Sequence, residues 1–265
     1  MAGYACIRAR NLFALNVLGP VRLVLRSSRY GHFGLRDLVR LEREVRASAE
    51  WRALRAEAAR VPNVARRADG SGPLKYLDLD LWLRANILRG VRLGLHLAAP
   101  LRILDVGCGA GLFVYLARRW GHEASGLDRP LTELSPSERL VYGTVPAVLG
   151  VPVLRASVAA HALPSLDGSY DLVTAFMICF NGHRGPDEWG AAQWRVFLGS
   201  VAARLSPSGR VHLAFNATRA RDGSRFYGSD VGALFDRCGA RRERGEVTLA
   251  SPRLASALGA EGTAA

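Results

Sequence analysis

The amino-acid sequence predicts an α/β fold, a doubly wound and mostly parallel sheet with a helical cap before it. The observations that predict it lie in one stretch. An apolar run, residues 101–104, ends at Asp105 and is followed by three glycines at alternate positions. Residues 112–120 have helical character and precede a glycine, as at a helix C-terminus. A second strand, 123–127, leads to Asp128, so both acids would lie at carboxyl ends of neighbouring strands, where such folds bind ligands.

The segment before this stretch is first basic and then helical. Residues 1–34 form a basic arm of undecided order, for which a targeting signal, an amphipathic surface helix and an over-extended start all remain open. Residues 35–61 are rich in Leu, Ala, Glu and Arg, which predicts one long amphipathic helix in which Glu42 and Arg46 can pair. A loop follows. Residues 81–97 are the next predicted helix.

Residues 35–97 are thus expected to form the helical cap and the helix that leads into the sheet. Beyond Asp128, the SPSE segment at residues 135–138 has the composition of a capping box. Further strands are expected at residues 151–156, 170–177, 210–216 and 240–249, and helices at 187–205 and 229–238. The core would cover residues 98–252, and residues 253–265 would be a flexible tail.

Composition limits the class of protein. With 265 residues, 49% of them hydrophobic, the chain can bury a full core. No apolar run approaches the roughly 20 residues that span a bilayer. Four cysteines without metal-ligand spacing predict reduced thiols, no metal site and a cytoplasmic location. The sequence indicates no particular oligomeric state.

A formal net charge of +13 is compatible with a nucleic-acid partner, but the kind and distribution of the basic residues do not favour this interpretation. Lys75 is the only lysine, so 35 of the 36 basic residues are arginine, a bias typical of a GC-rich coding sequence. The surplus is also spread along the chain. Trp189 and Trp194 are expected in a helix as core residues rather than as a platform for bases.

The spacing of the glycine turn indicates which nucleoside ligand fits. A dinucleotide fingerprint is G-x-G-x-x-G, whereas the glycines here are Gly107, Gly109 and Gly111. Asp105 precedes them at a place where a pyrophosphate would approach, and an anion is unfavourable there. A ligand with an ammonium group and no phosphate is more suitable. S-adenosylmethionine (SAM) is such a ligand, so a nicotinamide oxidoreductase is disfavoured.

These features together resemble a known enzyme family. The motif D-x-G-x-G-x-G after a strand, with Gly-Leu-Asp at the end of the next, resembles the class I SAM-dependent methyltransferases. Residues 170–176 (YDLVTAF) are similar to that family's fourth strand, and residues 205–215 (LSPSGRVHLAF) to its turn into the fifth. The resemblance implies an enzyme with a Rossmann-like methyltransferase sheet, closed by an antiparallel hairpin, although only one strand is evident at 240–249.

The resemblance also implies which residues bind the cofactor. Asp105 would accept a hydrogen bond from the amino group of SAM, and Asp128 would hold both ribose hydroxyls. The glycines would let the backbone approach, and Cys108 would offer backbone contacts. Arg129 would flank the adenine.

The adenine contact departs from the family pattern. The family often has an acid after the third strand, but residues 155–164 contain none, so Ser157 is a candidate substitute. Phe176, at the end of the fourth strand, is a further candidate contact with the cofactor.

The acceptor side is expected at residues 176–183 (FMICFNGH), facing the methyl group. Direct in-line transfer needs mainly that the acceptor be held in place, and a base only if the acceptor must lose a proton. Asn181 is a candidate to orient the acceptor, and His183 or His161 to act as the base. No N/D-P-P-Y/F sequence is present, which argues against methylation of adenine, cytosine or glutamine amides. A small-molecule acceptor is expected, with an RNA methyltransferase and a non-catalytic SAM-binding regulatory protein as alternatives.

Overall fold

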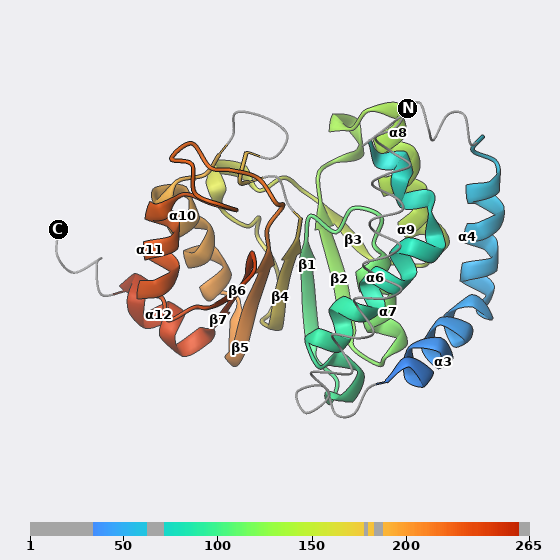
Figure 1. Cartoon of the computed structure of the whole chain (residues 1–265), viewed down its shortest axis with the longest axis horizontal. Coiled ribbons are helices and arrows are strands. Elements are labelled where there is room, and N and C mark those ends of the chain that lie inside the picture. Colours follow the sequence, from blue (N-terminus) through green and yellow to red (C-terminus); the bar gives the residue numbers. More distant parts are fainter. Residues whose placement is uncertain (1–33, 63–71, 178–179, 183–187, 260–265) are drawn as a thin grey trace. The chain divides into compact units, whose positions relative to one another are not determined.

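The computed structural model describes residues 34–62, 72–177, 180–182 and 188–259 (Figure 1). The chain divides into two compact units. The first consists of Met1–Pro100, Gly109–His122 and Leu131–Val153, and the second of Leu101–Cys108, Glu123–Pro130 and Leu154–Ala265. No helix in the described ranges has both the length and the apolar composition needed to cross a membrane.

Seven strands of the described residues form one sheet, and apart from Val153 their residues belong to the second unit. They are β1 (Arg102–Val106), β2 (Glu123–Asp128), β3 (Val153–Arg155), β4 (Tyr170–Phe176), β5 (Leu205–Ala214), β6 (Arg241–Glu243) and β7 (Glu246–Ala250). Their order is β3-β2-β1-β4-β5-β7-β6. Strand β1 is parallel to β2 and β4, and β4 is parallel to β5, whereas β7 is antiparallel to both of its neighbours. The doubly wound, Rossmann-like class is confirmed, and its topological switch point lies between β1 and β4.

The sheet ends in the antiparallel hairpin that the resemblance implies, although only one strand was evident in the sequence at residues 240–249. The two-residue connection between β6 and β7 is Arg244 and Gly245, with φ of 48° and 84°. Turns with positive φ at both central positions join tight hairpins, and Asn, Asp or Gly is preferred in them. Because Arg244 occupies the first position, the sequence carried no clear turn signal.

Three helices of the second unit lie together on one face of the sheet: α10 (Ala191–Ala202), α11 (Ser229–Arg237) and α12 (Ser251–Gly259) (Figure 1). They pack on the apolar residues that β1, β4, β5 and β7 present to that face. Trp194 and Phe197 of α10 are fully buried there, and Trp189 nearly so, as expected for core tryptophans. The helix α12 corrects the expected flexible tail as far as Gly259, because its Leu254 is buried in the same core.

One carboxylate joins the three central strands at their beginning. Asp171 of β4 accepts hydrogen bonds from the Arg102 backbone nitrogen of β1 (2.9 Å) and from Ser206 Oγ of β5 (2.8 Å). These two hydrogen bonds lower the pKa of Asp171 below its usual range, and the bond from the Arg102 backbone has the larger effect. The carboxylate therefore stabilises the fold in its ionised form.

The first unit is helical, and its long helices are α3 (Leu35–Arg46), α4 (Ala49–Ala59), α6 (Leu79–Arg92) and α7 (Leu112–Arg119). Shorter segments are η3 (Pro73–Leu77), η4 (Leu95–Leu97), η5 (Leu131–Glu133), α8 (Pro136–Glu138), η6 (Arg139–Thr144) and α9 (Val145–Val148). The capping box before α8 is confirmed, because Ser135 Oγ accepts from the Glu138 nitrogen and Glu138 Oε2 from the Ser135 nitrogen. Gly121 ends α7, as expected, with φ of 90°.

The helix expected over residues 35–61 is two helices. Ser48 is the N-cap of α4, and its Oγ accepts a hydrogen bond from the Trp51 nitrogen (3.2 Å). Because a serine at this position caps a new helix, it favours the end of one helix and the start of another over a single continuous helix. In the same way, α6 ends at Arg92 rather than at residue 97, because Gly94 adopts a left-handed conformation with φ of 76°.

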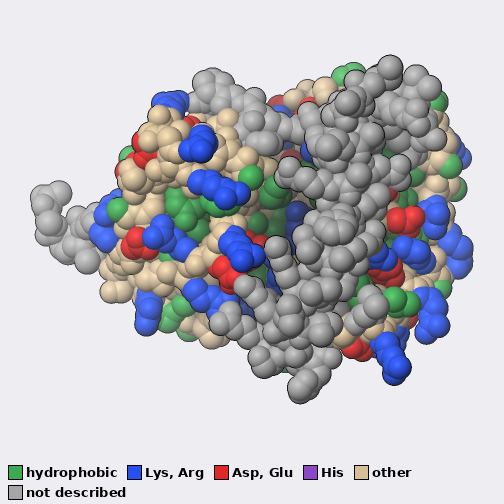
Figure 2. All heavy atoms as spheres, viewed as in Figure 1, with side chains coloured by type: hydrophobic (Ala, Val, Ile, Leu, Met, Phe, Trp, Pro, Cys, Tyr) green, Lys and Arg blue, Asp and Glu red, His purple; other side chains and the backbone are tan. Residues whose placement is uncertain are grey.

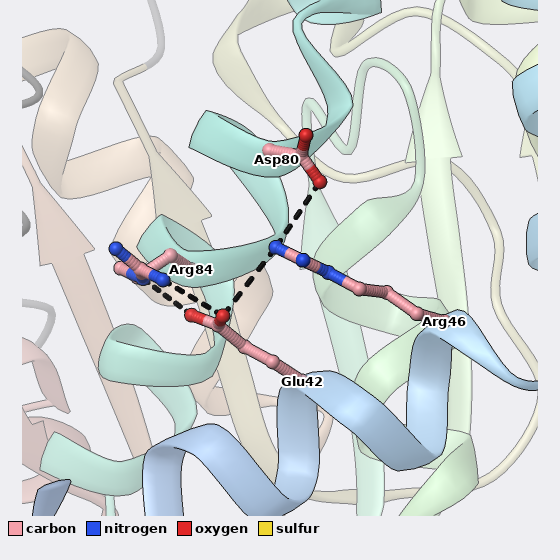
Figure 3. Close-up of polar contacts among 4 residues, drawn as sticks. All are labelled: Glu42, Arg46, Asp80 and Arg84. Carbon is pink, nitrogen blue, oxygen red and sulfur yellow. Dashed lines mark hydrogen bonds and ion pairs between the residues drawn. The ribbon is translucent and has the colours of Figure 1, made fainter.

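An ion-pair network joins α3 to α6 in the first unit (Figure 3). The buried Glu42 accepts two hydrogen bonds from the guanidinium of Arg84, of which the Nη2–Oε2 bond is 2.8 Å long. The expected pair of Glu42 with Arg46 is present at 3.4 Å, and Arg46 also contacts Asp80 at 3.1 Å. Since a buried carboxylate without partners is costly, this network is what allows Glu42 to be packed between the helices.

The substitution Asp171→Asn should lower the free energy of unfolding by about 1–3 kcal/mol at pH 7, since hydrogen bonds to an ionised group are lost. A folded-state pKa below the ordinary 3.8 contributes stability above that pH and loses it as the pH falls further. The difference from the wild type should therefore shrink at pH 3. Urea unfolding at pH 7 and pH 3 measures this difference in the free energy of unfolding. The control is Asp167→Asn, at an exposed position. Equal stability of wild type and Asp171→Asn at pH 7 would contradict this role.

Candidate functional site

The turn after β1 requires its glycines. Gly107, Gly109 and Gly111 all have left-handed backbones, with φ of 69°, 54° and 67°. Residues with a Cβ adopt this conformation at a cost that glycine avoids. The Gly107 and Cys108 nitrogens both donate to the Leu127 carbonyl oxygen at the end of β2, at 2.8 and 3.2 Å. The turn that follows β1 is thus rich in glycine and is hydrogen-bonded through its backbone to the end of β2.

Asp105 lies inside the sheet at the topological switch point. It is in register with Thr174 of β4, and its side chain is only 3% exposed. Thr174 Oγ1 donates a hydrogen bond to Asp105 Oδ1 at 2.7 Å. A carboxylate is therefore buried at the place where doubly wound sheets bind their ligands.

Asp128 lies at the end of β2, as expected, and is half-buried. Its Oδ1 accepts from the Arg129 backbone nitrogen at 2.8 Å, and its carbonyl oxygen accepts from the Ala156 nitrogen at 3.0 Å. The side chain of Arg129 itself is exposed. Both the side chain and the carbonyl oxygen of Asp128 therefore accept hydrogen bonds from backbone nitrogens. The residue lies at the carboxyl end of β2, the strand next to β1.

The pKa of the Cys108 thiol depends on its burial and on the charges of both acids. Burial raises the pKa of Cys108 well above its usual range, and the charges of Asp128 and then Asp105 raise it further, against a smaller opposite effect of Arg155. The half-buried thiol is therefore in a negative field that the two carboxylates share. Such a field favours a cationic group and disfavours a phosphate.

The segment after β3 contains Ser157 and His161, both half-buried. The Ser157 carbonyl oxygen accepts a hydrogen bond from the Ala159 nitrogen at 3.0 Å. Ala160 and His161 have left-handed backbones, with φ of 48° and 62°, which is costly for residues with a Cβ. The His161 ring packs edge-on against Trp189, with ring centroids 4.9 Å apart. His161 is thus held at the border of the aromatic core.

Asn181 joins two loops. Its Nδ2 donates to the carbonyl oxygens of Asn216 (3.0 Å) and Phe226 (2.8 Å), and the residue is buried. Asn216 Nδ2 in turn donates to the carbonyl oxygen of Met177 at the end of β4 (2.7 Å). The amide nitrogen of Asn181 is engaged by the backbone, so contact with an acceptor would have to use Oδ1.

The remaining expected site residues are Phe176 and His183. The ring of Phe176 is 5.8 Å from that of His212 of β5, between centroids. His183 lies outside the described residues. In the described part of the chain, no three His, Cys, Asp or Glu side chains are grouped so that they could hold a metal ion.

Two buried polar residues of the sheet escaped the sequence analysis. Thr174 and His212 are in register with each other and lie in the same row as Asp105, and His212 Nδ1 is 3.0 Å from Thr248 Oγ1. A signal was available, since each is a polar residue in the middle of an apolar strand (YDLVTAF and RVHLAF). Only the pairing of strands shows that they share a row with Asp105.

No family model and no curated protein matches the chain. Among solved structures, it is similar to the SAM-dependent methyltransferase SibL in its apo form, with a TM-score of 0.46 and 18% identity, over 90% of this chain and 76% of that one. It is also similar to CalS10, an amino pentose methyltransferase from Micromonospora echinaspora, with a TM-score of 0.44 and 18% identity, over 71% and 95% of the two chains. Similarity of this degree identifies neither ligand nor acceptor, which have to be inferred from this chain's own residues.

Cys108 should react slowly with iodoacetamide at pH 7.5, because the thiolate is the reactive form and the pKa of this thiol is raised. The labelling rate should still be rising at pH 9 instead of levelling off, and Asp128→Asn should raise the rate at pH 7.5 about threefold by removing a nearby charge. Peptide-resolved mass spectrometry measures the rates, and the buried Cys238 reports any unfolding. A labelling rate that Asp128→Asn leaves unchanged would contradict the shared negative field.

Proposed function

We propose that this chain is a class I SAM-dependent methyltransferase. The observation that carries the proposal is the buried carboxylate of Asp105 at the β1–β4 switch point, with a left-handed glycine turn directly after it. Asp128 stands at the end of the adjacent strand β2. Two acids and a bare backbone at neighbouring strand ends suit a ligand that carries an ammonium group and a diol.

The residues present fit SAM better than a dinucleotide. Asp105 would accept from the ammonium group and Asp128 from the two ribose hydroxyls, and the turn has left-handed backbone angles that glycine adopts at the least cost. A pyrophosphate would lie near the two carboxylates, whose charges add to the larger effect of burial in raising the pKa of Cys108, so the same charges argue against NAD-type ligands. Adenine contacts from Arg129, Ser157 and Phe176 are part of the proposal.

When bound, SAM supplies a methyl group that its sulfonium already activates. The protein then needs to hold the cofactor, orient the acceptor and exclude water. Asp105 and Asp128 would fix the two ends of the cofactor's polar part. A base is required only for an acceptor that must lose a proton, and His161 or His183 would take that role, with Asn181 Oδ1 orienting the acceptor.

We propose a small molecule as the acceptor and a cytoplasmic location for the enzyme. On the face shown in Figure 2, arginine side chains of the described residues are interspersed with acidic and uncharged surface and form no continuous patch there. An RNA-binding surface would have its arginine side chains in one continuous patch, since contacts with phosphates supply most of the affinity for RNA. The thiol of the described Cys108 is in no disulfide, which fits a reducing compartment.

Calorimetric titration should show binding of SAM and of its demethylated product, S-adenosylhomocysteine, and none of NADH. Asp105→Asn should weaken both interactions about 10- to 100-fold, because it removes a charge-assisted hydrogen bond to the ammonium group. Asp167→Asn, which removes an equal charge at an exposed site, is the control and should leave affinity unchanged.

Binding of NADH alone, or SAM binding that Asp105→Asn leaves intact, would contradict the proposed function. A wild-type protein that binds SAM is next incubated with it and pools of small metabolites or of RNA. Methylated RNA would indicate the RNA alternative. Binding without turnover on any pool would indicate a non-catalytic SAM-binding regulatory protein.

A further inference from the structure

Thr174 combines three properties that need a common explanation. It lies in the middle of β4, its side chain is fully buried, and its hydroxyl is directed at the carboxylate of Asp105 on the neighbouring strand. We propose that Thr174 is a positioning residue, whose hydroxyl orients the Asp105 carboxylate toward the ammonium group of the ligand. This inference rests on the proposed function, and it assigns a role within that site to a residue outside the sequence motif.

The direction of the hydrogen bond follows from the distances. A threonine hydroxyl has one proton to donate, and an ionised carboxylate can only accept. Thr174 Oγ1 is 2.7 Å from Asp105 Oδ1 but 3.5 Å from the carbonyl oxygen of Leu104. The proton is therefore directed to the carboxylate, at the usual length of a hydrogen bond between two oxygen atoms.

The hydroxyl is not needed to fill the strand. Valine has nearly the shape of threonine, favours strands as well and avoids the cost of burying a polar group. Neighbouring positions of β4 are apolar, with Val173 and Ala175 in the core. The hydroxyl is thus explained by the carboxylate that it contacts.

The strand geometry makes this contact stiff. Asp105 and Thr174 are partners in the parallel register of β1 and β4, so their side chains leave the same face of the sheet. The β-branched Thr174 has few side-chain rotamers, and its hydroxyl has a fixed place. One carboxylate oxygen held in this way sets the plane of the carboxylate.

The substitution Thr174→Val should weaken binding of S-adenosylhomocysteine about tenfold and leave binding of 5′-methylthioadenosine within about twofold of the wild type. The first ligand has the amino group and the second lacks the amino-acid part, so only the first depends on the orientation of Asp105. Thr174→Ser keeps the hydroxyl and should restore most of the selectivity. Calorimetry on the full chain measures both affinities for each variant.

The control is Thr248→Val, which removes the hydroxyl beside His212 in the same row and should leave the ratio of the two affinities unchanged. Loss of affinity for both ligands alike in Thr174→Val would show that the hydroxyl only supports the fold and would overturn the inference. Unchanged affinity for both would overturn it as well. A wild type that binds neither ligand would instead overturn the proposed function, and the inference with it.

Discussion

The buried charge of Asp105 is the constraint on which the rest of the site depends. A carboxylate inside a sheet is costly unless hydrogen bonds compensate for the lost water. The strand order places it at the switch point, Thr174 supplies a hydroxyl from the next strand, and the glycine turn follows at once in the chain. A carboxylate there, with Asp128 at the adjacent strand end, supports the proposal of a ligand with a cationic group.

Local signals were enough to predict the core of this arrangement. The glycines at 107, 109 and 111 each have the positive φ that makes glycine necessary, so their spacing carried real information. Gly121 and the capping box at Ser135 likewise act within one helical turn. The strands β1, β2 and β4 lie within two residues of their predicted bounds, because β1 and β4 are mainly apolar and β2 leads directly to Asp128. The cofactor roles of the acids stay a prediction.

Features that depend on contacts between distant segments could not be predicted. Thr174 looks like an ordinary strand threonine until β4 is placed beside β1. The tail residue Leu254 is buried because α12 packs on β5, β7 and α10. The hairpin of β6 and β7 turns at Arg244, which pays a conformational cost that no turn rule anticipates. In each case tertiary packing outweighs local preference.

A crystal structure of the protein with S-adenosylhomocysteine tests the central claim most directly. We expect the amino nitrogen of the ligand within hydrogen-bonding distance of the Asp105 carboxylate, and both ribose hydroxyls on Asp128. The backbone of residues 107–109 should contact the ligand without displacement. A ligand bound elsewhere, or bound with its amino group away from Asp105, would contradict the account.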